Sequence, residues 1–198
     1  MRQDVNLFLH GDLLRALPLA NGATIALKWP NDVLAGGKKL VGIGLEAEAV
    51  GDCLAVVVGI GTNVVAAPEG TPTPATSLAA LGVHISAEEL FTALSEAWVE
   101  FRGIWDKGRG FAEIRRLWLE RAAGLGEKVA IHTGSATLEG IFDTIDESGC
   151  LIVRTAEGRR VPVAAVQVLL PARPVAALTA SVKLDFLRQL NPRRAHHV

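Results

Sequence analysis

Between residues 24 and 64 the chain alternates short apolar runs with Gly, Asn and Pro. Such runs, rich in β-branched residues, are typical of successive strands joined by tight turns. The pattern predicts three strands, at residues 24–29, 39–46 and 54–60. The last of these begins with an apolar run that has no polar alternation, so we expect it in the middle of a sheet with both faces covered.

Helical periodicity follows a loop at residues 66–74 that is rich in Pro, Gly and Thr. Ser86 and Glu89 have the spacing of a capping box, which predicts the start of a helix. A second helix is predicted at residues 111–123, with Gly124 as its stop. Apolar residues recur on one face of the first helix, and we interpret this stripe as core packing rather than as a cofactor site. The stripe consists of Leu90, Leu94, Trp98, Phe101 and Trp105.

The helical period disappears after Gly124, which marks a domain boundary. Short strands separated by hairpin-type turns are predicted at residues 128–132, 137–145, 151–155 and 160–163. We therefore expect an α+β fold, with a mixed or antiparallel sheet packed with helices in residues 1–123 and a small β-barrel in residues 124–170. The barrel is small enough that we expect it to lean on the larger domain. Residues 171–198 contain three prolines and a basic end, and are predicted to form a loose tail.

Composition narrows the classes of function. The chain has 198 residues, 49% of them hydrophobic, and its 20 basic and 21 acidic side chains give a formal net charge of -1. This balance provides no general attraction to phosphate backbones, so nucleic acid is not expected as a partner. No apolar run approaches the roughly 20 residues that span a bilayer, and no signal peptide is apparent. Cys53 and Cys150 lack ligand spacing, which favours reduced thiols in a cytoplasmic protein without a structural metal.

Three segments place polar and glycine positions at strand ends. Each alone has a structural interpretation, as a turn, a solvated lysine or a strand bend. Together they bring a carboxylate near a lysine, because Asp32 and Lys39 flank one short turn. A carboxylate suits Mg²⁺, a cation suits an anionic substrate and an α-phosphate, and glycines let a ligand approach the backbone. The segments are Lys-Trp-Pro-Asn-Asp at 28–32, Lys-Lys-Leu-Val-Gly-Ile at 38–43 and Gly-Ile-Gly-Thr-Asn at 59–63.

The order of these motifs resembles that of the biotin-protein ligases, and Glu46 and the Ala-Thr-Ser-Leu segment at 75–78 match as well. The resemblance covers residues 25–168. It implies a biotin/lipoate ligase-like catalytic domain and an SH3-like C-terminal barrel. It also implies that biotin is joined, with ATP, to a lysine of a biotin carboxyl carrier domain of a carboxylase, through biotinyl-5'-adenylate. A homodimer is left open.

The resemblance assigns roles to individual residues. Lys39 and Asp32 are the implied catalytic residues: Lys39 contacts the biotin carboxylate or the phosphate, and Asp32 assists adenylation or binds Mg²⁺. Gly42 clears room for biotin. The biotin and ATP site is also implied to include Lys28, together with three residues that shape its nucleotide side, namely Trp29, Asn31 and Asn63.

Two features of the family have no counterpart in the 27 residues before Lys28. They are an arginine-rich glycine loop, Gly-Arg-Gly-Arg-Arg-Gly, and a Ser-Thr-Asn segment. Residues 1–23 do not clearly resemble that region, so we expect an N-terminally incomplete domain with weak adenylation and an open sheet edge beside Lys28 and Trp29. Two alternatives remain: a truncated, non-catalytic family member, and a lipoate-type ligase. The tryptophan in Lys-Trp-Pro and the barrel favour biotin.

Overall fold

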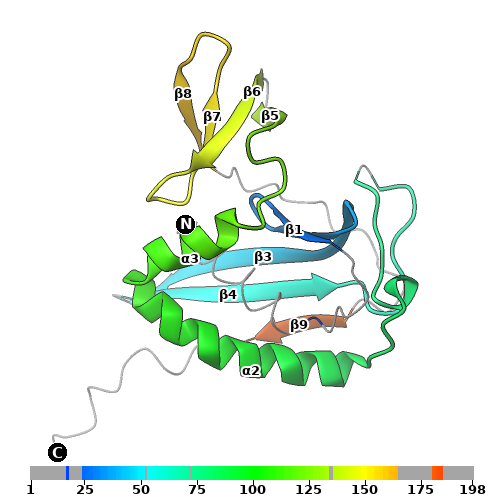
Figure 1. Ribbon diagram of the computed structural model, residues 1–198. Coiled ribbons are helices and arrows are strands. Elements are labelled where there is room, and N and C mark those ends of the chain that lie inside the picture. Colours follow the sequence, from blue (N-terminus) through cyan, green and yellow to red (C-terminus); the bar gives the residue numbers. More distant parts are fainter. Residues whose placement is uncertain are drawn as a thin grey trace, which may run out of the picture.

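The described part of the chain contains two antiparallel sheets, two α-helices and two short 3-10 helices, η1 (Ala79–Leu81) and η2 (Asp106–Gly108) (Figure 1). The computed structural model describes residues 17, 24–51, 53–71, 73–133, 136–164 and 180–184. The larger sheet has the order β1 (Ile25–Lys28), β2 (Asp32–Ala35), β3 (Lys38–Val50), β4 (Cys53–Thr62) and β9 (Ala180–Leu184). The smaller sheet has the order β5 (Lys128–Thr133), β6 (Ala136–Ile145), β7 (Leu151–Arg154) and β8 (Arg160–Val163). The α+β class is confirmed.

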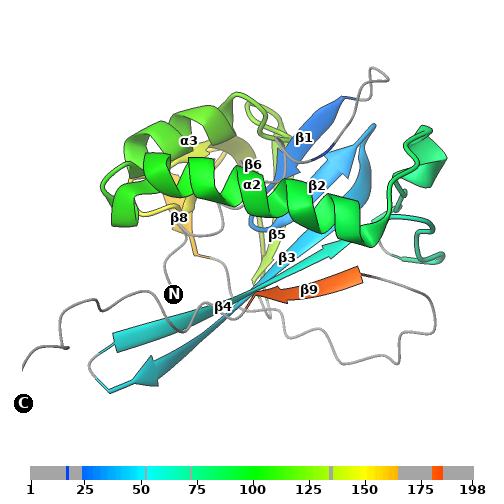
Figure 2. The ribbon, with the colours of Figure 1, turned by 90° about the horizontal axis from the view of Figure 1, so that it is seen from below.

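Helices α2 (Ala87–Trp105) and α3 (Phe111–Leu119) lie on the same face of the larger sheet (Figures 1 and 2). The capping box of Ser86 and Glu89 starts α2 as predicted. Ala97, rather than Trp98, is the fully buried member of the middle turn, and Trp98 and Trp105 are half-buried. The core between helix and sheet is made of Leu90, Leu94, Ala97 and Phe101 of α2 and Val41, Ile43, Leu45, Val58 and Ile60 of β3 and β4. None of the described helices is long and apolar enough to cross a membrane.

The strand predictions were correct in position and incomplete in number. Each predicted strand of the larger sheet has a counterpart in β1, β3 or β4, but Asp32–Ala35 forms β2 where only a turn was expected. The four-residue strand is too short for its alternation to stand out in the sequence. β4 lies between β3 and β9, as expected of a central strand, and Ala55 and Val57 on its helix-free face are half-buried.

The outer edge of β1 is paired at Leu27, whereas an open edge was expected beside Lys28 and Trp29. Leu27 of β1 donates a 2.8 Å hydrogen bond to the carbonyl of Arg121 and accepts one of 2.9 Å from the amide of Ala123. These bonds draw the chain out of helical geometry, which explains why α3 ends at Leu119 rather than at residue 123 as predicted. β1 is therefore the edge strand of the sheet, with a bridge to Ala122 at Leu27 on its outer side.

The smaller sheet packs against α3. Arg115 donates hydrogen bonds to the carbonyl of Ile145 and, at 3.1 Å, to Thr144 Oγ1. The rings of Trp118 and Phe142 lie with centroids 6.4 Å apart. The domain thus leans on the larger one, as expected from its size. Its four described strands pair in the order β5-β6-β7-β8, and residues 165–179 lie outside the described part of the chain.

The tail was predicted to be loose, and part of it is not. Residues 180–184 form β9, which pairs antiparallel with β4 from Val58 to Thr62. β4 would otherwise present an edge of unpaired backbone groups, which explains why an extended segment is accepted there. The remainder of the predicted tail lies outside the described residues.

Trp118 is 1% exposed, whereas the Trp98 side chain of the predicted stripe is only half-buried. We expect Trp118→Ala to lower the free energy of unfolding by about 3 to 5 kcal/mol, the usual cost of deleting a buried large aromatic. Trp98→Ala should cost clearly less. Urea unfolding followed by circular dichroism measures both, and equal losses in the two variants would contradict this ranking.

Candidate active site

A β-bulge in β3 creates the site. Val33 pairs with Val41 but Leu34 pairs with Lys39, so β3 contains one extra residue, Leu40, between the two partners. Leu40 and Val41 are adjacent in sequence and both lie in the helix-covered core, with 0% and 1% exposure. In regular strands adjacent residues point to opposite faces. The bulge therefore sends two consecutive side chains inward and leaves Lys39 and Gly42 together on the other face.

Lys39 and Asp32 meet on this helix-free face. Asp32 pairs in register with Gly42, and the Lys39 Nζ lies 2.6 Å from Asp32 Oδ1. The Asp32 oxygen is buried and no hydrogen bond reaches it from the described residues, so the contact is an ion pair rather than an aligned hydrogen bond. The side chains are 35% and 15% exposed, so the Lys39 side chain is partly open to solvent. The predicted convergence of this lysine and this carboxylate is confirmed.

The backbone of Lys39 is held at both its amide and its carbonyl. Its amide donates a 2.7 Å hydrogen bond to the Pro74 carbonyl, and its carbonyl accepts one of 2.9 Å from the Thr76 amide. The Asn63 side-chain amide donates to the Lys39 carbonyl at 3.4 Å and to the Thr76 carbonyl at 3.0 Å. The segment at 75–78 and the Gly-Ile-Gly-Thr-Asn motif therefore act on Lys39 through its main chain. In the sequence, the segment at 75–78 was recognised only as part of the family resemblance, and its contact with the main chain of Lys39 was not predicted.

Bare backbone forms the floor beside the ion pair. Gly42 pairs with Gly61 and Gly44 with Gly59, so four glycines share one face across β3 and β4. A Cβ on Gly42 would lie 3.2 Å from Lys39 Nζ and 3.7 Å from Asp32 Oδ1. At Gly44 the nearest atom, a backbone oxygen, is 4.0 Å away. Gly44 was not among the predicted site residues, although the repeat of glycines at every second position on both strands is its sequence signal.

The β1–β2 turn presents Asp32. Asn31 exchanges two bonds with Ile43: its side-chain amide donates to the Ile43 carbonyl at 2.7 Å, and its own carbonyl accepts from the Ile43 amide at 2.8 Å. Trp29 is half-buried, and its indole donates a hydrogen bond to the Gly149 carbonyl, outside the larger sheet. Lys28 is exposed, with its Nζ 3.5 Å from Thr73 Oγ1, and does not join the ion pair. The structure thus brings Asp32, Asn31, Lys39 and Gly42 together and leaves Lys28 at the periphery.

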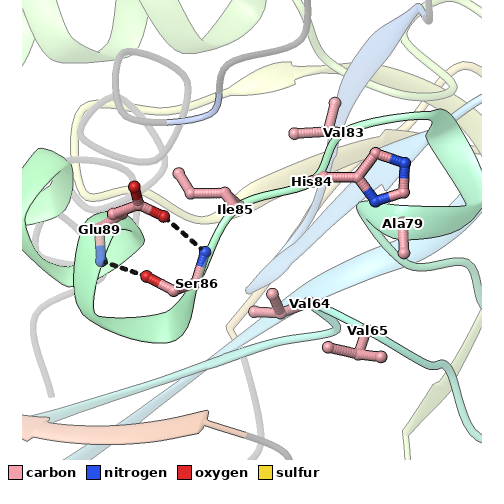
Figure 3. A pocket seen from close by; sticks show the side chains of 8 residues that line it. All are labelled: Val64, Val65, Ala79, Val83, His84, Ile85, Ser86 and Glu89. Atoms are coloured by element: carbon pink, nitrogen blue, oxygen red, sulfur yellow. Dashed lines mark hydrogen bonds between the residues drawn. The ribbon is translucent and has the colours of Figure 1, made fainter.

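A separate pocket of about 340 Å³ lies between the end of β4 and the start of α2 (Figure 3). Its walls are mainly valine, isoleucine and alanine side chains, with His84 exposed at the rim. The Glu89 carboxylate is already the acceptor for the Ser86 amide, and this bond lowers the pKa of Glu89. The pocket therefore offers mainly apolar surface, whereas the polar side chains of the candidate site meet at Lys39.

Two family models match the chain. The Biotin/lipoate A/B protein ligase family matches residues 9–63, and the Biotin protein ligase C terminal domain matches residues 124–169. The biotin--[acetyl-CoA-carboxylase] ligase of Paracoccus denitrificans is 43% identical over 158 residues, 75% of this chain and 65% of that protein. The bifunctional ligase/repressor BirA of Bacillus subtilis is 32% identical over 156 residues, 74% of this chain and 46% of that protein. The chain thus spans about half to two thirds of these relatives.

Solved structures agree with this match. The biotin protein ligase from Aquifex aeolicus in complex with biotin and ATP has a TM-score of 0.65 and 27% identity, and the alignment covers 80% of this chain and 67% of that one. The apo structure of the same Aquifex enzyme has a TM-score of 0.67, also at 27% identity, with coverage of 82% and 72%. Both similarities include most of the described fold.

These matches define the class as the biotin and lipoate protein ligases. Within it, the C-terminal domain match and the 43% identity show that the chain belongs to the biotin-protein ligase family. The first family match begins at residue 9, so the expectation that residues 1–23 do not resemble the family was wrong for residues 9–23. That segment carries no motif of special residue types, which explains why inspection of the sequence missed it.

The Asn63 side-chain amide donates to two backbone carbonyls, so we expect it to be required for stability. We expect Asn63→Asp, which keeps the size but removes the donor, to lower the free energy of unfolding at pH 7 by about 1 to 3 kcal/mol, the cost of unsatisfied buried polar groups. Folding should favour the protonated form of the introduced carboxyl, because only that form donates. The loss should therefore shrink as the pH falls toward about 4, the ordinary pKa of an aspartate. Urea unfolding of both proteins across this range measures the effect, and a loss independent of pH would contradict it.

Proposed function

We propose that this chain carries the catalytic machinery of an ATP-dependent biotin-protein ligase, which joins biotin to a lysine of a biotin carboxyl carrier domain through biotinyl-5'-adenylate. The observation that supports this most strongly is the Lys39 ammonium group beside a glycine floor, held in place by the other motif segments. A fixed, partly exposed cation next to bare backbone suits a ligand that carries a carboxylate and must lie flat on a sheet.

The proposed reaction has two steps. In the first, a carboxylate oxygen of biotin attacks the α-phosphorus of ATP, the bond from that phosphorus to the bridging oxygen breaks, and pyrophosphate leaves. In the second, the amine of the acceptor lysine attacks the acyl carbon of the mixed anhydride. AMP leaves, the amine loses a proton, and an amide bond remains. The main obstacle in the first step is the approach of two anionic groups, so alignment and charge neutralisation are what the protein must supply.

The proposed roles follow the geometry. Lys39 neutralises the biotin carboxylate or the α-phosphate, and Asp32 holds the ammonium group in place before substrates bind. Gly42 keeps the space beside Lys39 free for biotin. Asn31 and Trp29 shape the nucleotide side. Asn63 contributes to that side indirectly, since its described contacts are to backbone carbonyls.

Mg²⁺ is the metal that the family resemblance implies. The described residues contain no group of three His, Cys, Asp or Glu side chains that could hold a metal ion. Asp32 Oδ1 is already paired with the Lys39 ammonium at 2.6 Å. Asp32 would therefore hold Mg²⁺ through its other carboxylate oxygen, with substrate phosphates and water completing the shell. Bound there, Mg²⁺ would neutralise phosphate charge.

The wider setting is proposed on the same basis. Residues 1–123 form the catalytic domain, residues 124–170 an SH3-like barrel, and the protein acts in the cytoplasm on a carboxylase. A lipoate-type ligase is the second candidate, because one of the matching family models covers both substrates. The match of residues 124–169 to the biotin-specific C-terminal domain favours biotin. A homodimer stays open.

Lys39→Ala should reduce biotin-dependent exchange of pyrophosphate into ATP by about 10² to 10³, the usual effect of losing one charged donor in a transition state. Lys38→Ala is the matched control, because Lys38 is exposed on the neighbouring position of the same strand. It should change the rate by less than about twofold, since solvent screens an exposed charge. Biotin binding is measured in parallel by calorimetry, and folding by circular dichroism. Equal losses in the two variants would remove Lys39 from the site.

Gly42→Ala should weaken biotin binding by about tenfold or more, because overpacking costs roughly 1 to 3 kcal/mol. Its methyl group would press on the Lys39 ammonium from 3.2 Å. Gly44→Ala is the matched control on the same face, where the nearest atom is 4.0 Å away. Calorimetric titration with biotin compares the two. If Gly44→Ala weakens binding as much as Gly42→Ala, the ligand lies over both glycines and contact with Lys39 does not explain the effect.

A further inference from the structure

A strand from the C-terminal part of the chain joins the sheet that carries the candidate active site. β9 pairs antiparallel with the end of β4 and lies beside it (Figures 1 and 2). In this register Lys183 lies opposite Gly59, and Ser181 lies opposite Gly61. Residues directly opposite each other in an antiparallel pair share one face of the sheet. Positions 181 and 183 therefore lie on the face of the candidate active site.

The sequence of β9 explains this register. Its five residues alternate between apolar and polar, which is the pattern of a strand with one buried face. The apolar positions pair with buried residues of β4, in the pairs Val58–Leu184, Ile60–Val182 and Thr62–Ala180. A slip of one residue would place Lys183 on the helix-covered face. Burial of a charge among apolar side chains is costly, so the register that places Lys183 opposite Gly59 is favoured.

The glycine floor leaves room for a ligand between Lys39 and β9. The floor consists of Gly42, Gly44, Gly59 and Gly61, which pair across β3 and β4. A Cβ on Gly59 or Gly61 would have a backbone oxygen of β3 as its nearest described neighbour, at 3.8 and 3.9 Å. Neighbouring strands lie about 4.8 Å apart, so about 10 Å separates β3 from β9. A flat ligand on this floor therefore has Lys39 on one side and the position of Lys183 on the other.

One ammonium group leaves part of the substrate charge unbalanced. Lys39 already lies 2.6 Å from Asp32 Oδ1, which offsets part of its charge. The first proposed step brings a carboxylate against a triphosphate, so further positive charge on the same floor would stabilise it. The two family models match residues 9–63 and 124–169, so β9 lies outside both and the family match assigns no role to Lys183.

We propose that β9 supplies Lys183 as a second cation of the candidate active site, across the glycine floor from Lys39. Its ligand is an anionic group of a substrate, either the carboxylate of biotin or a phosphate of ATP. The inference rests on the proposed function in naming these two substrates. β9 then contributes to the chemistry of the site in addition to pairing the edge of β4.

Lys183→Met removes the charge and keeps a long side chain. We expect it to weaken the binding of biotin or of ATP by about fivefold to tenfold, between the effects of an exposed ion pair and of a charged hydrogen bond. Biotin-dependent exchange of pyrophosphate into ATP should slow by about tenfold or more, because a cation matters most where charge develops in the transition state. Calorimetric titration with each substrate shows which anion Lys183 meets.

Two further variants control for side effects of the substitution. Lys183→Arg keeps the charge and should retain most of the parent rate. Lys128→Met makes the same change at an exposed strand lysine of the smaller sheet, and should alter neither binding nor exchange.

Cysteine pairs test the register without any activity. Opposite residues in an antiparallel pair have Cα atoms about 4.5 to 5.5 Å apart, within the range of a disulfide. In a chain with Cys53→Ala and Cys150→Ala, the pair Gly61→Cys and Ser181→Cys should crosslink within one chain on mild oxidation. The pair Gly61→Cys and Val182→Cys should not, because neighbouring positions of a strand lie on opposite faces. Peptide mass spectrometry identifies the linked residues.

The outcomes distinguish this inference from the proposed function. Exchange and binding in Lys183→Met equal to those of the parent would remove Lys183 from the site and leave the proposed function standing. A parent chain without biotin-dependent exchange would overturn the proposed function, and substrate binding in Lys183→Met would then decide the role of Lys183. Failure of the first cysteine pair to link within one chain, or equal linking in both pairs, would overturn the register and the inference with it.

Discussion

The site depends on one extra residue in β3. Strand alternation would place Lys39 on the opposite face from Asp32 if β2 and β3 paired regularly, because Leu34 would then lie opposite Leu40. The bulge moves Leu34 opposite Lys39 and turns both Leu40 and Val41 into the core. The burial of these two apolar side chains stabilises the irregular pairing, and it brings an ammonium group within 2.6 Å of a carboxylate. Packing on one face thus determines the chemistry available on the other.

The two faces of the larger sheet differ in what they contribute. The helix-covered face supplies the apolar contacts that pack α2 on β3 and β4. On the other face, four glycines in paired positions lie beside the Lys39–Asp32 ion pair, so this part of the face offers flat backbone next to a directed charge. A packed support under a glycine surface would suit the proposed alignment of two anionic reactants, because little reorganisation would then be needed when they bind.

Contacts between distant segments hold the polar groups of this face. Asn63 and the segment at 74–76 hold the main chain of Lys39, and Asn31 ties the turn before Asp32 to β3. Trp29 extends this network to the small domain through Gly149. Motifs that are separate in the sequence therefore act on two side chains, mostly through backbone hydrogen bonds rather than through direct contact with a ligand.

The sequence alone determined the α+β class, the capped helix, the domain change after Gly124 and the lysine and aspartate of the site, because periodicity, capping spacing and motif order are local properties. Tertiary structure decided what depends on distant partners. Pairing of Leu27 with residues 121–123 ends α3 early, and pairing of residues 180–184 with β4 makes part of the predicted tail a strand. The bulge in β3 places the Lys39 side chain on the same face as Asp32. Each of these outcomes depends on hydrogen bonding or burial between segments far apart in the chain, so a local sequence pattern does not predict it.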